Sequence, residues 1–473
     1  MQMERIVEAS AAKMRLAGIQ EPPIAAFSAS LRRFLSGDSG LTPDESLSDL
    51  GRLPRYEELE EDVGPARTTE MLRQVAVIKL NGGLGTSMGL ERAKSLIRIK
   101  DNLNFLDVIA RQILRLRKQS GTGQPSFFLM NSFSTQKDSL EYLLKYPELT
   151  SGEPVDFLQS MAPKLDASTL LPVEYPADPG LEWCPPGHGD IYVTLLTTGI
   201  LDQLLAQGIR FLFVSNSDNL GASLDLRVAS HFANSGKSFL MEVAERTSAD
   251  RKGGHLARRL RDGRLILRES AQVPKSDETA FQDIAKHRYF NTNNLWIRLD
   301  DLKEHLVESV GCLPLPLIRN VKTVDPRNSS SRPVIQLESA MGAAIECFSD
   351  SGAVIVPRTR FSPVKTTSDL LSIRSDAFIV EDGSRLLLSE KRAGRPPVVS
   401  LDSIYYQKLE DFEGFFRRGV PSLQECESLK VVGPVDFEAG VVCQGAVEIR
   451  NGEASSPRSV VRGVYKDVTL ELA

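Results

Sequence analysis

The stretch Leu80–Gly89, with the sequence LNGGLGTSMG, carries four glycines directly after the apolar run Val75–Leu80. Glycine has no Cβ, so successive backbone N–H groups in such a loop can turn towards an anion and approach it closely. A lysine, Lys94, follows five residues after the last glycine. A strand, a glycine-rich loop and a trailing lysine together predict a site for phosphate groups. The alternative is a flexible turn that holds no ligand.

Two familiar phosphate-binding motifs are absent from this loop. The dinucleotide motif G-x-G-x-x-G does not match the spacing of Gly83, Gly85 and Gly89. The P-loop motif needs a lysine directly after its last glycine, whereas Lys94 lies five residues beyond Gly89. The loop therefore belongs to some other class of phosphate site.

Two more residues could take part in phosphate chemistry. Asp218 lies just after the apolar run Phe211–Val214, and a carboxylate at the tip of a strand can hold Mg²⁺ together with substrate phosphates. Aspartate is also common in plain turns, which is the alternative here. Lys365 lies in a polar stretch after the strand-like run Val354–Val356. Its position alone is equally compatible with an ordinary surface lysine.

The segments that must position these residues alternate between two types. Strand-like runs are predicted at Val75–Leu80, Ser126–Met130, Phe211–Val214 and Phe239–Val243, and helices between them at Phe105–Lys118 and Ile191–Ala206. This alternation predicts an α/β fold with a central, mostly parallel sheet flanked by helices. In such sheets, ligands bind beyond the carboxyl ends of the strands. We therefore expect one catalytic domain over residues 75–390.

The two ends of the chain have other patterns. Residues 1–74 are predicted to form a helical segment, with one apolar face at Ile6, Val7, Met14 and Leu16, another at Leu31, Phe34 and Leu35, and an acidic connector over Leu41–Glu61. In residues 391–473, apolar residues recur every six positions, in the columns Leu429, Val435, Val441, Val447 and Val431, Phe437, Cys443, Ile449. This period predicts a short parallel β-helix. Plain antiparallel strands are the alternative.

Composition narrows the class of protein. The chain has 473 residues, a net charge of −5 and no long basic run, which disfavours nucleic acid or an anionic membrane as the main partner. No apolar stretch reaches the ~20 residues that span a bilayer, and the N-terminus lacks the apolar core of a signal peptide. The five cysteines include no C-x-x-C pair, which favours reduced thiols. We expect a cytoplasmic protein.

Six stretches, taken in order, resemble the UTP–glucose-1-phosphate uridylyltransferase (UDP-glucose pyrophosphorylase) family. They are Leu80–Gly89 with Ala93-Lys-Ser95, Met130–Phe133, Pro185–Asp190, Ser215–Gly221, Phe290–Trp296 and Arg360–Asp369. Family members usually have proline where this chain has Ala93. The resemblance runs from about residue 75 to the C-terminal repeats, and residues 1–74 carry little of it.

The resemblance implies a Rossmann-like, GT-A type nucleotidyltransferase fold and a Mg²⁺-dependent reaction. In that reaction, glucose 1-phosphate attacks the α-phosphorus of UTP in line and yields UDP-glucose and pyrophosphate. The partners are thus UTP and glucose 1-phosphate, with no nucleic acid and no membrane. Because two polyanions must meet, the protein must mainly position them and neutralise their charge. Self-association through the C-terminal β-helix, as in some relatives, is a further possibility that the sequence leaves open.

The resemblance also implies roles for individual residues. Lys365 and Lys94 are the expected catalytic residues, and Asp218 the expected metal ligand. The expected nucleotide-binding residues are Leu80, Asn81, Gly82, Gly83, Lys94, Gln159, Gly187, Asp218 and Lys365. The expected sugar-phosphate-binding residues are Gly82, Gly83, His188, Asn216, Ser217, Asp218, Glu269 and Asn293. The attacking phosphate is already anionic, so His188 is expected to bind substrate rather than act as a base.

Three alternatives remain open at this stage. One is a pyrophosphorylase for another sugar 1-phosphate; relatives of that kind typically carry an arginine where this loop has Thr86-Ser-Met88. A second is a UDP-sugar-dependent glycosyltransferase, but such enzymes often have a D-x-D metal motif where this chain has Asn216-Ser-Asp218. A third is a binding protein without turnover, which the presence of Lys94, Asp218 and Lys365 disfavours.

Overall fold

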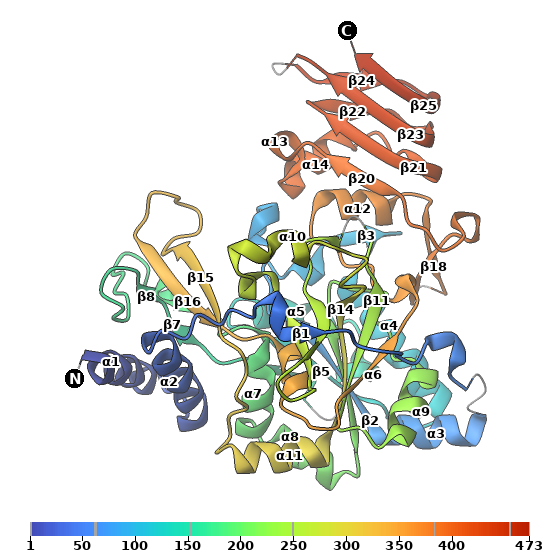
Figure 1. The fold of residues 1–473 in the computed structure, drawn as a ribbon. Helices are drawn as coiled ribbons and strands as arrows, with labels where there is room; N and C mark the ends of the chain where they lie inside the picture. Colours follow the sequence, from blue (N-terminus) through green and yellow to red (C-terminus); the bar gives the residue numbers. More distant parts are fainter. Residues whose placement is uncertain are drawn as a thin grey trace.

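A computed structural model describes residues 2–60, 64–150, 154–247, 250–382, 384–453 and 456–472 of the chain. Its centre is a mixed sheet (Figure 1). Seven of its strands follow the order β17-β11-β14-β10-β2-β5-β6. All of these strands except β14 run in the same direction. Their bounds are β2 Val75–Asn81, β5 Ser126–Asn131, β6 Asp156–Leu158, β10 Phe211–Asn216, β11 Phe239–Glu245, β14 Tyr289–Arg298 and β17 Gly352–Ile355. The four strands predicted from the sequence and the mostly parallel centre are thus confirmed.

Three more strands join the sheet near the start of β14, where His255 pairs with Phe290, and each of them is antiparallel to its neighbour. These are β12 His255–Arg259, β13 Leu265–Arg268 and β1 Leu47–Ser48. Strand β1 lies in the predicted N-terminal connector, which therefore runs along the sheet and adds an edge strand to it. Arg55 continues this path with a parallel bridge to Ile355 at the end of β17.

Helices cover both faces of the sheet because its strands alternate apolar side chains between the faces. In β2, Val75 and Val77 contribute to one buried cluster, and Ala76 and Ile78 to the other. The first cluster includes α3 Pro65–Gln74, α4 Phe105–Ser120, α9 Leu226–Ser235 and α12 Thr367–Arg374. The second includes α7 Ile191–Thr197, α8 Ile200–Ala206 and α11 Leu299–Glu308. Two buried layers thus hold the sheet between helices.

One segment that was predicted as a single helix is broken into two helices. The stretch Ile191–Ala206 forms α7 and α8 rather than one helix. Gly199 lies between them with φ 75°, a left-handed conformation that interrupts an α-helix and that glycine adopts at little cost.

The N-terminal helices α1 (Gln2–Leu16) and α2 (Glu21–Leu35) pack together at one side of the molecule (Figure 1). They share a third apolar cluster with the small sheet of β8 Leu165–Asp166, β15 Ile318–Thr323 and β16 Pro333–Glu338. Ile6, Val7 and Met14 are buried there as predicted, but Leu16 is 91% exposed because it ends α1 beyond the contact. The division at residue 74 stays a prediction; Met71 and Leu72 of α3 pack into the first core cluster.

The C-terminal strands all pair in parallel. One sheet has the order β20-β21-β23-β25, and a second pairs β22 with β24. Their bounds are β20 Val398–Leu401, β21 Ser422–Val432, β22 Val435–Phe437, β23 Val441–Asn451, β24 Arg458–Val460 and β25 Gly463–Leu472. Leu429 lies opposite Val447 and Val431 opposite Ile449, so residues of each predicted column meet across neighbouring strands. The alternative of antiparallel strands is excluded for these pairs.

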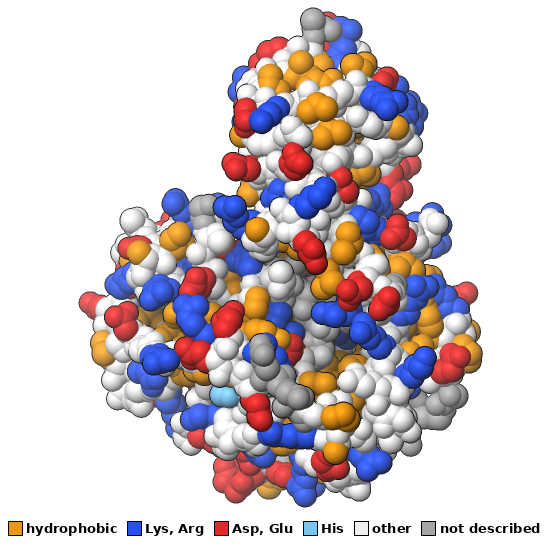
Figure 2. Space-filling view, turned by 90° about the vertical axis from the view of Figure 1, so that its right-hand side faces the viewer, with side chains coloured by type: hydrophobic (Ala, Val, Ile, Leu, Met, Phe, Trp, Pro, Cys, Tyr) orange, Lys and Arg blue, Asp and Glu red, His pale blue; other side chains and the backbone are white. Residues whose placement is uncertain are grey.

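Short elements complete the fold. They are β3 Arg98–Lys100, β4 Leu103–Asn104, β7 Ala162–Pro163, β9 Trp183–Cys184, β18 Phe378–Glu381, β19 Arg385–Leu388, α5 Gln136–Leu143, α6 Pro147–Thr150, α10 Glu278–Phe281, α13 Ser403–Tyr406 and α14 Leu409–Phe415. All five cysteines are free thiols. Within the described ranges, no helix combines the length and the apolar character that crossing a bilayer requires. On the face shown in Figure 2, basic and acidic side chains are interspersed over both the main body and the smaller C-terminal lobe.

Candidate functional site

The glycine loop leaves the carboxyl end of β2 and folds back onto Lys94. Gly85 and Gly89 have φ of 69° and 73°, so the chain turns at both positions in a conformation that favours glycine. The backbone N–H of Lys94 donates to the carbonyl oxygen of Gly83 at 3.1 Å. A Cβ atom on Gly85 would lie 3.3 Å from Cγ of Lys94. The loop and the lysine are therefore one structural unit, as the sequence predicts.

Lys94 and Asp218 meet although 124 residues separate them. The Lys94 Nζ atom lies 2.7 Å from Oδ2 of Asp218, and both side chains are largely shielded from solvent. The other carboxylate oxygen, Oδ1, is buried and has no hydrogen-bond partner among the described residues. An unpaired buried carboxylate oxygen is costly, which makes it a position where a cation would be stabilising.

Lys365 is brought to the same place by its backbone. The N–H of the preceding residue, Val364, donates to the carbonyl oxygen of Asp218 at 3.1 Å. The N–H of Lys365 itself donates to Oδ2 of Asp369 at 2.9 Å, at the start of α12. The side chain of Lys365 is exposed and borders a cavity of about 630 Å³. Lys94, Asp218 and Lys365 therefore share one region with the glycine loop.

Glu269 and Asn293 line the same cavity as Lys365. Burial raises the pKa of Glu269, and the positive charge of Lys365 opposes this shift. A Cβ on Gly254 would lie 2.4 Å from Oε2 of Glu269, so a larger residue at position 254 would displace this carboxyl group. Asn293 has φ 58° at a bulge of β14, where Asn291 donates to its side-chain oxygen at 2.7 Å. Both predicted sugar-site residues thus lie at the wall of one cavity.

His188 follows Gly187 in a tightly packed turn. Gly187 has φ 86°, and a Cβ on it would lie 2.4 Å from the carbonyl oxygen of Ser339. The His188 Nδ1 atom accepts a hydrogen bond from the backbone N–H of Met341 at 2.9 Å. Burial, and secondarily the charge of Lys365, lower the pKa of His188 to about 4. The ring is therefore neutral at pH 7, with Nε2 as its donor.

Gln159 lies beside the first glycines of the loop. A Cβ on Gly82 would come within 2.8 Å of Nε2 of Gln159, so the amide of Gln159 lies directly against the loop backbone and would have to shift for a larger residue. The backbone N–H of Gln159 donates to the carbonyl oxygen of Asn131 at the end of β5. Asn81 differs from the other predicted ligands: its buried side chain donates to Asn131 Oδ1 and Ser139 Oγ. The amide nitrogen of Asn81 is therefore committed to holding the end of β2 against β5 and α5.

Asn216 and Ser217 are at the end of β10, next to the end of β2. The N–H of Ser217 donates to the carbonyl oxygen of Leu80 at 3.0 Å, which extends the pairing of the two strands to the edge of the site. All of the predicted site residues thus lie at or near the carboxyl ends of the parallel strands, or on the loops packed against them.

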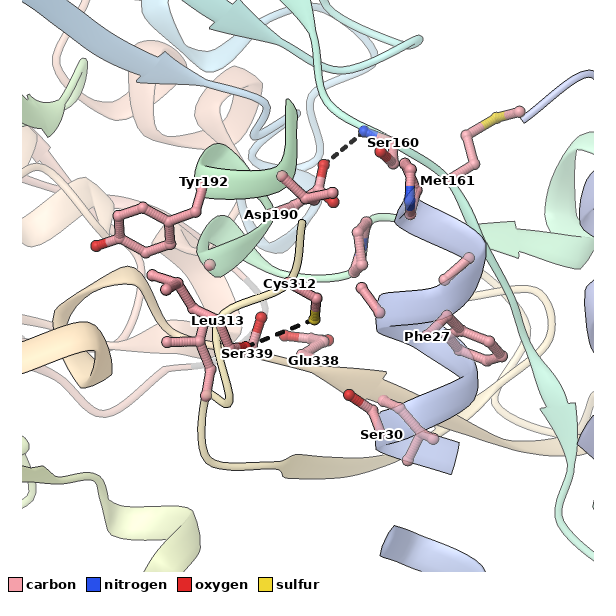
Figure 3. Close-up of a pocket in the computed structure, with 18 of the residues that line it drawn as sticks. Phe27, Ser30, Ser160, Met161, Asp190, Tyr192, Cys312, Leu313, Glu338 and Ser339 are labelled. Carbon is pink, nitrogen blue, oxygen red and sulfur yellow. Dashed lines mark hydrogen bonds between the residues drawn. The ribbon is translucent and has the colours of Figure 1, made fainter. Parts of the chain in front are cut away.

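A small second cavity lies between α2 and the segments that carry Gln159 and His188. It measures about 70 Å³ and is lined by Phe27, Ser30, Asp190 and Cys312, among others (Figure 3). Because about 10–15 Å³ of such volume holds one water, the cavity has room for a few waters and not for a nucleotide. Asp190 Oδ2 accepts from the N–H of Ser160 at 2.6 Å. This bond ties the segment after Gln159 to the turn that carries His188.

Sequence reasoning missed three buried charged residues behind the site. Lys79, in the run interpreted as apolar, donates to Ser215 Oγ at 2.8 Å and to the carbonyl oxygen of Ala222. Burial lowers the pKa of Lys79 to about 7. Arg360 forms two hydrogen bonds to Glu242, at 2.6 and 2.7 Å. The one available signal was a lysine within a run of buried strand residues.

Comparisons with known proteins agree on one family. A family model described as UTP–glucose-1-phosphate uridylyltransferase matches residues 26–444. A Saccharomyces cerevisiae protein of that name is 43% identical over 379 residues, covering 80% of this chain and 74% of the relative. The corresponding Solanum tuberosum protein is 40% identical over 393 residues, covering 83% and 79% of the two chains.

Solved structures give the same result over nearly the whole chain. A Leishmania major UDP-glucose pyrophosphorylase mutant in complex with UDP-glucose superposes with a TM-score of 0.93 at 44% identity, covering 98% of this chain and 99% of that one. A UDP-glucose phosphorylase from Trypanosoma brucei has a TM-score of 0.92 at 45% identity, covering 99% and 100%.

Proposed function

The chain belongs to the UTP–glucose-1-phosphate uridylyltransferase family of nucleotidyltransferases, and on this premise we propose that it makes UDP-glucose and pyrophosphate from UTP and glucose 1-phosphate. The observation that carries the proposal is that Lys94, which is bonded to the glycine loop, pairs with Asp218, and that the backbone of Asp218 is bonded to Val364, next to Lys365. Two polyanions must approach each other in this reaction, and the ammonium groups of Lys94 and Lys365, with a cation that Asp218 would hold, supply the local positive charge that a chain of net charge −5 lacks overall.

In the proposed mechanism, a phosphate oxygen of glucose 1-phosphate attacks the α-phosphorus of UTP in line and pyrophosphate leaves. Lys365 stabilises the charge that grows on the α-phosphate, and its compact ammonium on a flexible stem suits a moving phosphoryl group. Lys94 and the backbone amides from Gly85 onwards bind the β and γ phosphates. His188 has a binding role in this proposal because the anionic nucleophile needs no base, and because a pKa of about 4 makes the ring a weak base.

The residues present fit a Mg²⁺ ion. Asp218 offers the buried, unpaired oxygen Oδ1, while its Oδ2 pairs with Lys94. The described residues contain no cluster of three or more acidic, histidine or cysteine ligands, so the protein would supply few ligands and the phosphates the rest. This is the usual coordination of Mg²⁺. When bound, the ion would neutralise part of the negative charge of the triphosphate. The ion pair between Asp218 and Lys94 keeps the carboxylate and the ammonium group next to each other.

The remaining residues bind the two substrates. Gln159 and Gly187 contact uracil, and the backbone of Leu80, Asn81, Gly82 and Gly83 binds the nucleotide. An amide both donates and accepts, which matches the polar edge of uracil. Gly82, Gly83, His188, Asn216, Ser217, Asp218, Glu269 and Asn293 surround the sugar phosphate. Glu269 suits this role because a carboxyl group can form hydrogen bonds with sugar hydroxyls.

The proposed organisation has three parts: residues 1–74, a catalytic domain over 75–390 and a β-helix over 391–473. The two parallel C-terminal sheets support the β-helix.

Strand β25 is an edge strand with Val464 65% exposed, which supports self-association through this part. Light scattering of the whole protein tests this: a monomer at all concentrations contradicts it. A cytoplasmic location remains our expectation.

A pyrophosphate-release assay tests the function and the choice of sugar. With UTP and Mg²⁺, glucose 1-phosphate should give rapid release, whereas galactose 1-phosphate and N-acetylglucosamine 1-phosphate should react poorly. Thr86-Ser-Met88, in place of an arginine, is the feature that favours glucose. Equal rates for all three sugars would contradict the choice of glucose. No release with any of them would contradict the proposed function.

A further inference from the structure

The loops that carry Asp218 and Lys365 start far apart in the sheet. Asp218 follows β10 and Lys365 follows β17, and β14 and β11 lie between these strands. Three strand spacings amount to about 14 Å. Nothing in the sheet itself therefore sets the separation of the two side chains, and contacts between the loops must do so.

Asn219 joins the two loops through its side-chain amide. Its Oδ1 accepts from the backbone N–H of Ser362 at 2.9 Å, and its Nδ2 donates to the carbonyl oxygen of Arg360 at 3.1 Å. Asn219 also forms an isolated antiparallel bridge with Pro363. It is buried, and it lies between Asp218 and the residues that precede Lys365. One side chain thus uses both of its polar ends to hold one loop against the other.

Arg360 contacts the Asp218 loop at Ser223, the end of the loop away from β10. Its Nη2 atom donates to the carbonyl oxygen of Ser223 at 3.1 Å, while its own carbonyl accepts from Asn219. Glu242 on β11 fixes the guanidinium group, and Glu242 also accepts hydrogen bonds from Asn294 at 2.9 Å and Trp296 at 3.0 Å. The carboxylate is fully buried and is saturated by donors from two elements. Burial alone would lower the pKa of Arg360, but the charge and hydrogen bonds of Glu242 raise it, so the pair stays ionised.

Gly221 shows how closely the two loops pack. A Cβ atom at this position would lie 2.3 Å from the carbonyl oxygen of Thr359 and 2.9 Å from the carbonyl carbon of Arg360. Both are backbone atoms, which cannot move aside as a flexible side chain can. The loops therefore meet backbone to backbone, with hydrogen bonds on both sides of the contact.

We propose that Asn219 and the buried Glu242–Arg360 pair form a positioning unit that fixes the Asp218 carboxylate relative to the Lys365 ammonium. The inference rests on the catalytic roles of Asp218 and Lys365 in the proposed function. The exposed side chain of Lys365 makes no ion pair with a carboxylate in the described ranges, so its backbone anchors determine where its charge lies. Phosphoryl transfer depends on such positioning, and a shift of about 1 Å can cost about 100-fold in rate.

A double-mutant cycle of Asn219→Ala and Lys365→Ala tests the proposal in the full-length protein. At saturating UTP, glucose 1-phosphate and Mg²⁺, Asn219→Ala should lower kcat by about 10- to 100-fold. The KM for UTP should change by less than about threefold. In the Lys365→Ala background, the same substitution should cost at least about five times less, because the position of an absent ammonium has no value.

Asn451→Ala is the matched control for loss of a buried asparagine. Asn451 is 4% exposed in the C-terminal part and donates to the carbonyl oxygens of Pro434 and Ser456 at 2.7 and 2.9 Å. It should lower Tm much as Asn219→Ala does and leave kcat within about twofold. An equal loss of kcat in the two variants would overturn the proposal, and so would an equal effect of Asn219→Ala in both Lys365 backgrounds. If Lys365→Ala alone leaves kcat unchanged, the catalytic role of Lys365 in the proposed function is wrong. The single variant therefore tests the proposed function, and the cycle tests the positioning unit.

Discussion

Replacing Lys365 with alanine should remove catalysis without harming the fold. The side chain is exposed and makes no carboxylate ion pair in the part of the chain that the structure describes, so the free energy of unfolding should change by less than about 0.5 kcal/mol. If the ammonium stabilises charge that appears only in the transition state, its loss should cost about 3–4 kcal/mol, or about 100- to 1,000-fold in kcat. The KM for UTP should stay within about threefold.

A second readout of this variant comes from the electrostatics of the cavity. The charge of Lys365 contributes to the low pKa of His188 and opposes the raised pKa of Glu269. Lys365→Ala should therefore raise the pKa of both groups, with His188 still below its ordinary value of 6.5 because burial, the larger cause, remains. NMR titration of the His188 ring measures this directly.

Lys466→Ala is the charge-matched control, because Lys466 is exposed on β25 in the C-terminal sheet. It should leave kcat, KM and the His188 titration unchanged. Stopped-flow measurement of the first turnover separates the chemical step from product release. The proposed role of Lys365 is refuted if Lys365→Ala weakens UTP binding as much as it slows chemistry, or if the His188 titration does not move.

Three further predictions concern single residues. Gly187→Ala adds a clash with Ser339 to a backbone at φ 86°, so it should lower the free energy of unfolding by about 2 kcal/mol or more and raise the KM for UTP. Its control is Gly199→Ala, at φ 75° with open space around it, which should lower the free energy of unfolding by about 1–2 kcal/mol and leave the KM unchanged. Equal KM values for the two variants would contradict this prediction. Asp218→Asn should raise the Mg²⁺ concentration for half-maximal rate at least about tenfold, and an unchanged Mg²⁺ dependence would exclude Asp218 as the ligand. Folding lowers the pKa of Lys79 from 10.5 to about 7, so between these pH values the unfolded chain binds more protons than the folded one. The free energy of unfolding of the wild type, measured by chemical denaturation, should therefore rise relative to that of Lys79→Met from pH 7 to about 10. A difference between the two proteins that does not depend on pH would contradict this.

Local signals in the sequence predicted the parts of the site that lie next to each other in the chain. Apolar runs indicated the strands, and four glycines after one of them led to the prediction of a phosphate-binding loop. The rule that ligands bind at the carboxyl ends of parallel strands favoured Asp218, whereas the position of Lys365 alone was equally compatible with a surface lysine, and its expected role came from the family resemblance. What the spacing could not give is the contact itself: Lys94 meets Asp218 across 124 residues.

The buried charges behind the site were missed for the same reason. Glu242 and Arg360 are 118 residues apart, and each would be destabilising without the other. Nothing local to either residue indicates its partner. The prediction of one helix over Ile191–Ala206 failed differently, because its apolar spacing continues through Gly199 and only the backbone conformation of that residue shows the break.

A crystal structure with Mg²⁺, glucose 1-phosphate and a UTP analogue that resists attack at the α-phosphorus would test the convergence of charges most directly. The expected complex has Lys94 against the β or γ phosphate, an Asp218 oxygen on the metal ion and the Lys365 ammonium against the α-phosphate. A triphosphate bound with its α-phosphate away from Lys365, or a Lys94–Asp218 pair that contacts neither phosphate nor metal, would contradict the account.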